Sequence, residues 1–200
     1  MDQRLPLTVR KRLQARERIV RAADELFTEH GFANVSVADI ADRAEVGRTT
    51  FFRQFGDKQE VVFAQEEELI ATITAAHQQS SARVPSTPQE AIAQLRDIVL
   101  VLCAQATQDP TSYSRHYTFI EQSIELRARD ALKMQQFAER FAELLTARGA
   151  DTATALFASQ IALACYQTAK GRKGNDPRSL VAEARVAFEQ TLSLGCDPTG

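Results

Sequence analysis

The sequence lacks the features that mark membrane, secreted and disulfide-bonded proteins. No apolar run approaches the ~20 residues that a membrane-spanning helix needs, and no signal peptide is visible at the N-terminus. The three cysteines, Cys103, Cys165 and Cys196, are odd in number and far apart, which favours free thiols in a reducing compartment. The remaining composition is that of an ordinary globular chain. We therefore expect a cytoplasmic protein that makes no contact with a membrane.

Motifs for catalysis and for cofactor or metal binding are also missing. The chain has no Gly-rich phosphate loop, no nucleophile elbow and no pair of catalytic carboxylates. Its histidines, His30, His77 and His116, are scattered, and none stands at a metal-binding helical spacing from another histidine or a cysteine. The acidic run Glu66–Glu68 is expected to form a solvated face. We predict no catalytic residue, no cofactor and no metal ion.

The stretch from Ser36 to Lys58 carries the strongest pattern in the chain. Ser36 and Asp39 have the spacing of a capping box, which opens a helix. Small or apolar residues then fall on one face of that helix, namely Val37, Ile40, Ala41 and Ala44. The pattern stops at Gly47, which would allow a sharp reversal of the chain at little steric cost.

A second helix is predicted from Arg48 to Phe55. Phe51 and Phe55 are four residues apart and would face the core together. The opposite face of this helix comprises Thr49, Thr50 and Arg53, flanked by Arg48 and Phe52. An arginine there can bind guanine or phosphate, and threonines can contact phosphate or the thymine methyl group. Two short helices around a tight turn predict a helix-turn-helix whose second helix enters the major groove. A plain helical hairpin inside a larger core is the alternative.

Charge is distributed unevenly although its total is close to zero. With 24 basic and 26 acidic residues, no bulk attraction to nucleic acid is expected. Residues 1–21 nevertheless hold seven basic residues against two acidic ones. A basic arm before a helix-turn-helix can reach phosphates or the minor groove, and a solvated terminus fits the same sequence equally well.

Amphipathic helices account for the rest of the sequence. A helix over residues 10–30, ended by Gly31, would complete a three-helix domain. Another helix begins at Lys58, and the polar segment 78–88, with two prolines, reads as a loop. No strand pattern or internal repeat is visible. We expect an all-α protein of about nine helices, with a DNA-binding domain over residues 1–57 and a second helical domain over residues 58–200.

Residues Arg16–Val62 resemble the N-terminal domain of the TetR-type family of bacterial transcriptional regulators. The resemblance covers about a quarter of the chain and includes a first helix ending in LFTEHGF, the SVADIA opening, the EVGRTTFFRQF recognition helix and the GDK turn. It implies contacts with double-stranded DNA from Ser36, Val37, Arg48, Thr49, Thr50, Phe52, Arg53 and Lys58. Many members have tyrosine at the position of Phe52. Phenylalanine cannot donate a hydrogen bond to phosphate, so its contact would be apolar, and Val37 likewise lacks the hydroxyl often seen at its position.

The helix predicted after Asp151 is apolar around much of its circumference, and the final helix, predicted to start at Asp176 and Pro177, carries apolar residues on one side. They could pair with their copies in a partner subunit as a four-helix bundle, or they could complete the core of one subunit. The resemblance favours a homodimer, because members of the family dimerise through these helices. The interface would then use Leu156, Ile161, Leu180, Val181 and Phe188.

The second domain also carries bulky apolar and aromatic side chains interleaved with a few polar ones. Small-molecule sites are usually built in this way, although each of these residues could simply pack against the others. The resemblance implies an effector site in this region, and we expect an apolar or amphipathic effector. The candidate residues are Leu102, Tyr113, Arg115, His116, Tyr117, Ile120, Gln122, Phe137, Phe141 and Tyr166.

These patterns predict a DNA-binding regulator, and the resemblance implies a dimeric repressor that a small-molecule effector releases from a palindromic operator. Two other classes of function stay open. An enzyme housed in a helical bundle is disfavoured by the absence of a catalytic constellation. A protein–protein adaptor that has lost DNA binding is disfavoured by the intact Arg48, Arg53 and Lys58.

Overall fold

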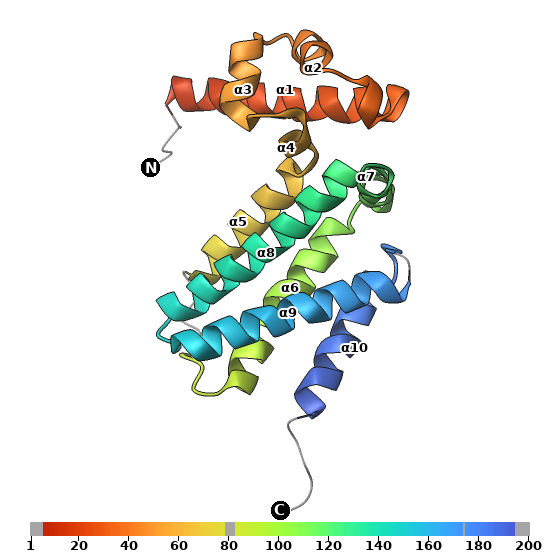
Figure 1. Ribbon diagram of the computed structural model, residues 1–200. Coiled ribbons are helices and arrows are strands. Elements are labelled where there is room, and N and C mark those ends of the chain that lie inside the picture. The colour runs from red at the N-terminus through yellow and green to blue at the C-terminus, as the bar shows by residue number, and fades with distance from the viewer. Residues whose placement is uncertain (1–5, 79–82, 174, 195–200) are drawn as a thin grey trace, which may run out of the picture. The chain divides into compact units, whose positions relative to one another are not determined.

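The computed structural model describes residues 6–78, 83–173 and 175–194, and within these ranges the chain is helical with no β-strand. The predicted all-α fold is thus confirmed (Figure 1). The described residues form ten α-helices and one short 3-10 helix, η1, where about nine helices were expected. The helix predicted from Lys58 is interrupted at Phe63, a fully buried residue that lies between α4 (Lys58–Val62) and α5 (Ala64–Gln78).

Two compact units divide the chain. The first comprises residues 1–65 together with 119–126, and the second comprises residues 66–118 and 127–200. The segment 119–126 includes the end of α7 (Pro110–Gln122) and the start of α8 (Ile124–Ala147). The functional boundary predicted at residue 57 stays a prediction, because compactness alone places the division after Gln65.

The first unit is built on α1 (Leu7–His30), against which α2 (Val37–Arg43) and α4 pack. The connection η1 (Phe32–Asn34) and α3 (Arg48–Phe55) complete it. α1 ends where predicted, at Gly31, whose φ of 77° favours glycine. The basic residues from Arg10 onward belong to α1, whereas Arg4 lies outside the described residues. The core joins all these helices through Ile19, Leu26, Phe27, Val35, Ile40, Phe51, Phe55 and Val61.

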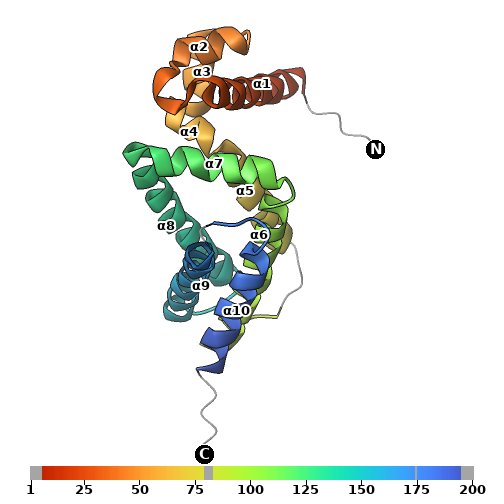
Figure 2. The ribbon, with the colours of Figure 1, turned by 90° about the vertical axis from the view of Figure 1, so that its right-hand side faces the viewer.

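In the second unit, three helices pack against one another: α6 (Pro88–Ala106), α9 (Thr152–Arg172) and α10 (Leu180–Ser193). Figures 1 and 2 show α9 running across the other two helices. Small buried side chains on α9 leave room for its neighbours on several sides, namely Ala155, Ala158, Ser159, Ala162 and Ala169. Thr87 caps α6 as its spacing from Glu90 indicates, with the Glu90 amide donating to the Thr87 hydroxyl at 3.2 Å.

Candidate nucleic-acid interface and ligand pocket

The helix-turn-helix opens at the capping box predicted for Ser36 and Asp39. The Asp39 amide donates to the Ser36 hydroxyl at 3.2 Å, and the Ser36 amide donates to the Asp39 carboxylate at 2.8 Å. Both bonds satisfy donors at the start of α2 that have no partner within the helix. The hydrogen bonds from Ser36 also hold the pKa of Asp39 below its ordinary value.

Glu45, and not Gly47, reverses the chain between α2 and α3. Glu45 has a φ of 52°, in the left-handed region, and the amide of Val46 after it donates to the Ala41 carbonyl at 2.9 Å. This is a Schellman motif, in which the left-handed position is usually occupied by glycine. Gly47 has an ordinary φ of −71° and precedes the first turn of α3. The expectation that Gly47 supplies the reversal is therefore wrong.

α3 presents one face to the core and the other to solvent, as predicted. Phe51 and Phe55 are buried, with ring centroids 5.9 Å apart. Thr50 is half-buried, and the exposed positions are Arg48, Thr49, Phe52 and Arg53. Phe52 is 47% exposed and stands edge-on to Phe51. Within the described residues, no hydrogen bond or ion pair engages Arg48 or Arg53, so both guanidinium groups can approach a ligand from solvent.

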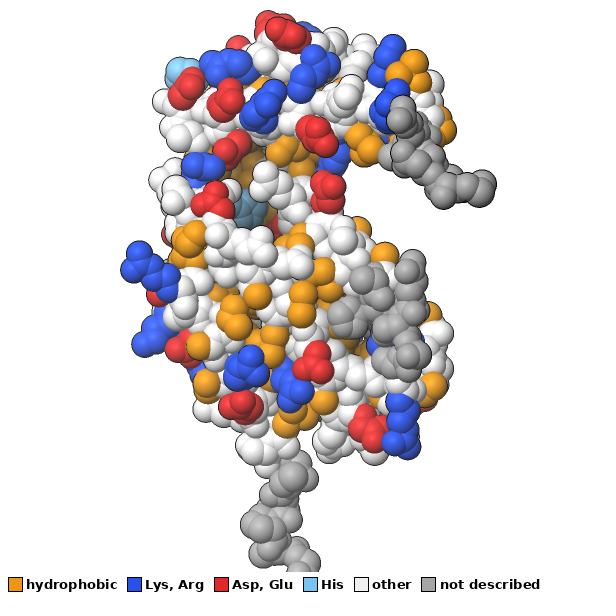
Figure 3. Space-filling view, turned by 180° about the vertical axis from the view of Figure 1, so that it is seen from behind, with side chains coloured by type: hydrophobic (Ala, Val, Ile, Leu, Met, Phe, Trp, Pro, Cys, Tyr) orange, Lys and Arg blue, Asp and Glu red, His pale blue; other side chains and the backbone are white. Residues whose placement is uncertain are grey.

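Two other proposed contacts, Ser36 and Val37, already have structural roles, and so does Arg43, which was not among the proposed contacts. Ser36 is exposed but forms the capping box, and half-buried Val37 packs against the core of the first unit. Arg43 forms ion pairs with Glu25 at 3.2 Å and Glu29 at 3.4 Å. In Figure 3 the face of this unit turned to the viewer carries basic and acidic side chains side by side. α3 therefore carries the clearest set of unengaged basic groups in the helix-turn-helix.

Lys58 is half-buried and holds two parts of the first unit together. Its ammonium donates to the carbonyl of Phe32 at 2.9 Å and to that of Val35 at 2.8 Å. The same ammonium lies 4.3 Å from the centre of the Phe32 ring, within cation–π range. Burial lowers the pKa of Lys58. Sequence reasoning assigned Lys58 to phosphate, and the structure gives it a structural role that the sequence did not indicate.

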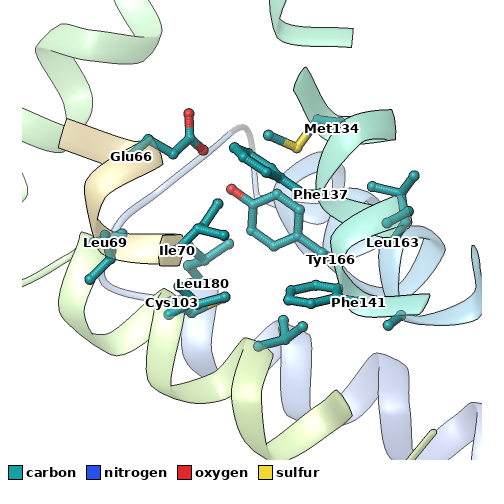
Figure 4. A pocket seen from close by; sticks show the side chains of 15 residues that line it. Glu66, Leu69, Ile70, Cys103, Met134, Phe137, Phe141, Leu163, Tyr166 and Leu180 are labelled. Carbon is teal, nitrogen blue, oxygen red and sulfur yellow. The ribbon is translucent and has the colours of Figure 1, made fainter. Parts of the chain in front are cut away.

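The second unit contains an apolar pocket between α5, α6, α8, α9 and α10 (Figure 4). The volume within which the centre of a water-sized sphere can move is about 60 Å³. A single water needs ~10–15 Å³ on this measure, so the space exceeds one or two waters. Most of the lining is aliphatic or aromatic, and its polar side chains are Glu66 and Tyr166.

Four of the ten residues predicted to bind a ligand line this pocket: Leu102, Phe137, Phe141 and Tyr166. Tyr117 is buried beside the lining, with its hydroxyl 3.0 Å from that of Tyr166. Tyr113 is also buried and donates to Asn175 at 3.1 Å. Arg115 and His116 are half-buried outside the lining. Ile120 and Gln122 belong to the first compact unit and are not among the lining residues.

Glu66 is the lining residue that sequence reasoning placed in solvent. Only 19% of its side chain is exposed, and its Oε2 atom is buried without a hydrogen-bond partner. Burial, and then the negative charge of Asp130, raises the pKa of Glu66 to about 7. Leu69, Ile70 and Ile73 follow it at helical spacing, a signal that could have placed Glu66 on the buried face of α5. The expectation of a fully solvated acidic face is therefore wrong for Glu66, whereas Glu68 is exposed.

Glu66 belongs to a group of ionisable side chains that we call the acid–base cluster, formed by Glu66, Glu67, His116, Asp130, Lys133 and Lys170. Lys133 is buried and forms an ion pair with Glu67, and Lys170 lies 3.6 Å from Asp130. His116 Nε2 lies 3.9 Å from Glu66 Oε2. The Lys170 ammonium also lies 4.1 Å from the centre of the Tyr117 ring.

The residues predicted for a dimer interface separate into two groups. Leu180 and Phe188 are buried in the core of the chain itself, at 2% and 0% exposure, and offer no surface to a partner. Leu156 is 51% exposed, and Ile161 and Val181 are half-buried. Phe157 and Val186, which sequence reasoning missed, expose 53% and 39% of their surface. The apolar surface of α9 and α10 is thus carried by Leu156, Phe157 and Val186.

Several simpler features concern the described residues alone. No helix among them is both long and apolar enough to cross a membrane. They contain no group of histidine, cysteine or acidic side chains that could hold a metal ion. Cys103 and Cys165 are free, in line with the expectation of free thiols, and both are buried, whereas Cys196 lies outside the described residues.

A helix-turn-helix whose second helix exposes basic side chains, in a chain whose second unit contains an apolar pocket, is an arrangement typical of DNA-binding regulators that respond to small molecules. Residues 19–64 match the family described as bacterial regulatory proteins, tetR family. The matched segment contains the whole helix-turn-helix, so this part of the chain is similar to the DNA-binding domain of those regulatory proteins.

Individual proteins similar to this chain agree with the family match. The transcriptional regulator TcmR of Streptomyces glaucescens is 42% identical over 55 residues, which are 28% of this chain and 24% of that protein. The match thus spans about a quarter of the curated relative. Thermus thermophilus FadR in complex with lauroyl-CoA has a TM-score of 0.61 at 21% identity, over 92% of this chain and 97% of that one.

A second solved structure covers a similar share of the chain. SmeT, the repressor of a Stenotrophomonas maltophilia multidrug efflux pump, in complex with triclosan has a TM-score of 0.60 at 18% identity, over 90% of each chain. At these identities, both structures show a shared fold.

Proposed function

We propose that this protein is a homodimeric transcriptional repressor that binds a palindromic DNA operator and is released from it by a small effector. The observation that carries the proposal is the solvent face of α3, where Arg48 and Arg53 are exposed and unengaged. The core side chains Phe51 and Phe55 fix the orientation of that face. We place the protein in the cytoplasm, with the DNA that it binds.

In this proposal, α3 enters the major groove. Arg53 reads a guanine edge, and Thr49, one turn before it, contacts phosphate or a thymine methyl group. Phe52 supplies an apolar contact, and Arg48, Thr50 and Ser36 contact the backbone. The Lys58 ammonium donates two of its three hydrogens to backbone carbonyls, so one hydrogen is left to donate to a phosphate. Val37 is half-buried, so only the exposed part of its side chain contacts DNA.

Effector release follows from the position of α5. This helix begins at Ala64, in the core of the first unit, and continues into the second unit, where Leu69 and Ile70 line the pocket. A ligand that shifts α5 would change the separation of the two recognition helices in the dimer. Because half-sites lie about 34–36 Å apart, a small change in that separation prevents both helices from docking together. Solved neighbours with lauroyl-CoA and with triclosan support an apolar or amphipathic effector.

The test is selection of bound fragments from a random pool of duplex DNA, followed by affinity measurement on the selected site. We expect a palindrome. Arg53→Ala should weaken binding by about 1–3 kcal/mol and relax the preference at one base pair per half-site. Arg96→Ala is the matched control, because Arg96 lies on α6 beside its partner Asp97 and its loss removes the same charge. Recovery of no common sequence, or an Arg53→Ala variant with unchanged affinity and preference, would refute the assignment of α3.

A further inference from the structure

The pocket presents one polar atom that the protein itself leaves unsatisfied. Glu66 lies on the same face of α5 as Leu69 and Ile70, three and four residues later, and all three line the pocket. In Figure 4 the Glu66 carboxylate and the Tyr166 hydroxyl lie near the same end of the pocket, while Cys103 and Phe141 lie further from the carboxylate. The buried Oε2 atom of Glu66 accepts no hydrogen bond, and leaving such an atom unpaired destabilises a structure.

The charges around Glu66 do not balance. The acid–base cluster contains three carboxylates and two ammonium groups, and each ammonium already has a carboxylate partner: Lys133 pairs with Glu67, and Lys170 pairs with Asp130. Glu66 is the carboxylate left without an ammonium partner. His116 can cancel the excess negative charge only when protonated, and its Nε2 stands 3.9 Å away, beyond hydrogen-bond distance.

We propose, on the basis of the effector function proposed above, that the effector is a small apolar molecule that carries one ammonium group, and that Glu66 receives this group at the end of the pocket. The ammonium donates to Oε2 and neutralises the cluster, while the apolar body lies against the aliphatic and aromatic lining. An anionic head group would place a second negative charge beside a buried carboxylate, which the low dielectric penalises strongly. Burial, and then the negative charge of Asp130, raises the pKa of Glu66 even though Lys170 and Lys133 lower it, so the two lysines do not offset the cost of the buried charge.

The size of the pocket decides the probes. Its 60 Å³ for sphere centres corresponds to roughly four to six water-sized groups, so a five-carbon chain fits. n-Pentylamine, 1-pentanol and pentanoate share that chain and differ in the charge of the head group. The amine has a pKa close to that of a lysine side chain, ~10.4, and is therefore cationic at pH 8, where Glu66 is mostly ionised.

Isothermal titration of the full-length protein at pH 8 tests the proposal. We expect pentylamine to bind at least about tenfold more tightly than pentanol, because hydrogen bonds between charged groups are stronger than neutral ones, and pentanoate to bind most weakly. Glu66→Gln should remove the preference for the amine over the alcohol, while Glu67→Gln, the matched loss of the adjacent carboxylate, should retain it. At pH 7, where about half of Glu66 is protonated, the amine should also release about half a proton, seen by titration in two buffers of different ionisation enthalpy.

Three results would overturn the proposal: pentanoate binding as tightly as pentylamine, an amine preference that survives Glu66→Gln, or no binding of any probe. If Glu66→Gln does not fold, the comparison of the three probes on the wild-type protein decides alone. Operator affinity separates this inference from the proposed function. An amine that binds through Glu66 without weakening operator binding refutes release by effector but keeps the ligand class. Release by pentanoate and not by the amine keeps the function and refutes the class.

Discussion

At the scale of single residues, the turn of the helix-turn-helix depends on Glu45. A residue with a side chain in the left-handed region costs about 1 kcal/mol relative to glycine. Glu45→Gly should therefore raise the free energy of unfolding by about 1 kcal/mol, measured by urea denaturation. Glu45→Ala is the control, because it removes the carboxylate that lies 3.8 Å from Arg18 and keeps the strained backbone. We expect it to change stability by less than about 0.5 kcal/mol. A glycine variant less stable than wild type would contradict this explanation.

Lys58 is the second residue whose role can be measured directly. Lys58→Ala removes two charge-assisted hydrogen bonds to partly buried backbone carbonyls and should lower the free energy of unfolding by roughly 1–3 kcal/mol. Lys11→Ala, which removes an exposed lysine from α1, should leave stability nearly unchanged. The salt dependence of operator binding reports the phosphate contact separately, since each lost contact flattens the slope by about one unit per monomer. Unchanged stability together with a flattened slope would make Lys58 a phosphate ligand alone.

The role of a residue could be predicted from the sequence where that role depends on residues close to it in the chain. The capping box at Ser36, the end of α1 at Gly31 and the inward pair Phe51–Phe55 all involve contacts within a few residues. The electrostatic surroundings of Glu66 depend instead on Asp130 and Lys170, which lie far from it in the sequence, on α8 and α9. Glu45 has the left-handed conformation because the hydrogen bonds of the Schellman motif fix its position in the turn, even though a glycine, Gly47, lies two residues later.

At the scale of helices, the solvent faces of α9 and α10 identify the surface that we propose for dimerisation. Leu156, Phe157 and Val186 are exposed apolar residues on these two helices, and a closed two-fold interface would bury them. Phe157→Asp should convert the dimer to monomers, because an unpaired charge in a buried interface is costly, and light scattering would report the change. Operator binding should then lose its cooperativity.

The control for this prediction is Leu13→Asp. Leu13 is 40% exposed but lies on α1 in the first unit, so its replacement should leave the oligomeric state unchanged. Phe188→Asp would be uninformative, because Phe188 is fully buried in its own chain and its loss would unfold the protein. A Phe157→Asp variant that remains dimeric would place the interface on another surface.

Helix positions could be predicted from periodicity and capping signals, but the buried side of an almost wholly apolar helix could not. α9 carries apolar residues around most of its circumference, so its sequence alone does not distinguish buried Ala158 from exposed Phe157. That distinction follows from where α6 and α10 cross it.

At the scale of the whole molecule, α5 links the proposed ligand site to the DNA-binding unit through the chain itself. Coupling of this kind is reciprocal, so an effector that weakens operator binding must itself bind more weakly to the operator complex by the same factor. Typical coupling energies of about 1–3 kcal/mol correspond to a five- to 150-fold change in affinity. In the proposal, the pocket and the acid–base cluster bind the effector, and α5 transmits the effect of binding to the DNA-binding unit.

The pH dependence of global stability should report the buried state of Glu66. In the folded protein its pKa is about 7, against an ordinary value of 4.5. The folded state therefore binds more protons than the unfolded state between these two values, and stability falls as pH rises through this window. The difference of about 2.5 pKa units corresponds to roughly 3 kcal/mol, lost fully only above pH 7. Below pH 4.5 the group is protonated in both states and contributes no difference.

Glu66→Gln isolates this contribution, because glutamine has nearly the same shape and does not titrate. The free energy of unfolding should be measured by urea denaturation at intervals from pH 4 to pH 8 for both proteins. Relative to the variant, wild type should lose stability progressively between about pH 4.5 and pH 7, and then lie parallel to it. The other charged groups around Glu66, namely Glu67, His116, Asp130, Lys133 and Lys170, are present in both proteins, so their titration largely cancels in the comparison. Two parallel curves across the whole range would mean that Glu66 is solvated in solution, and the charge imbalance on which the cationic ligand depends would then be absent.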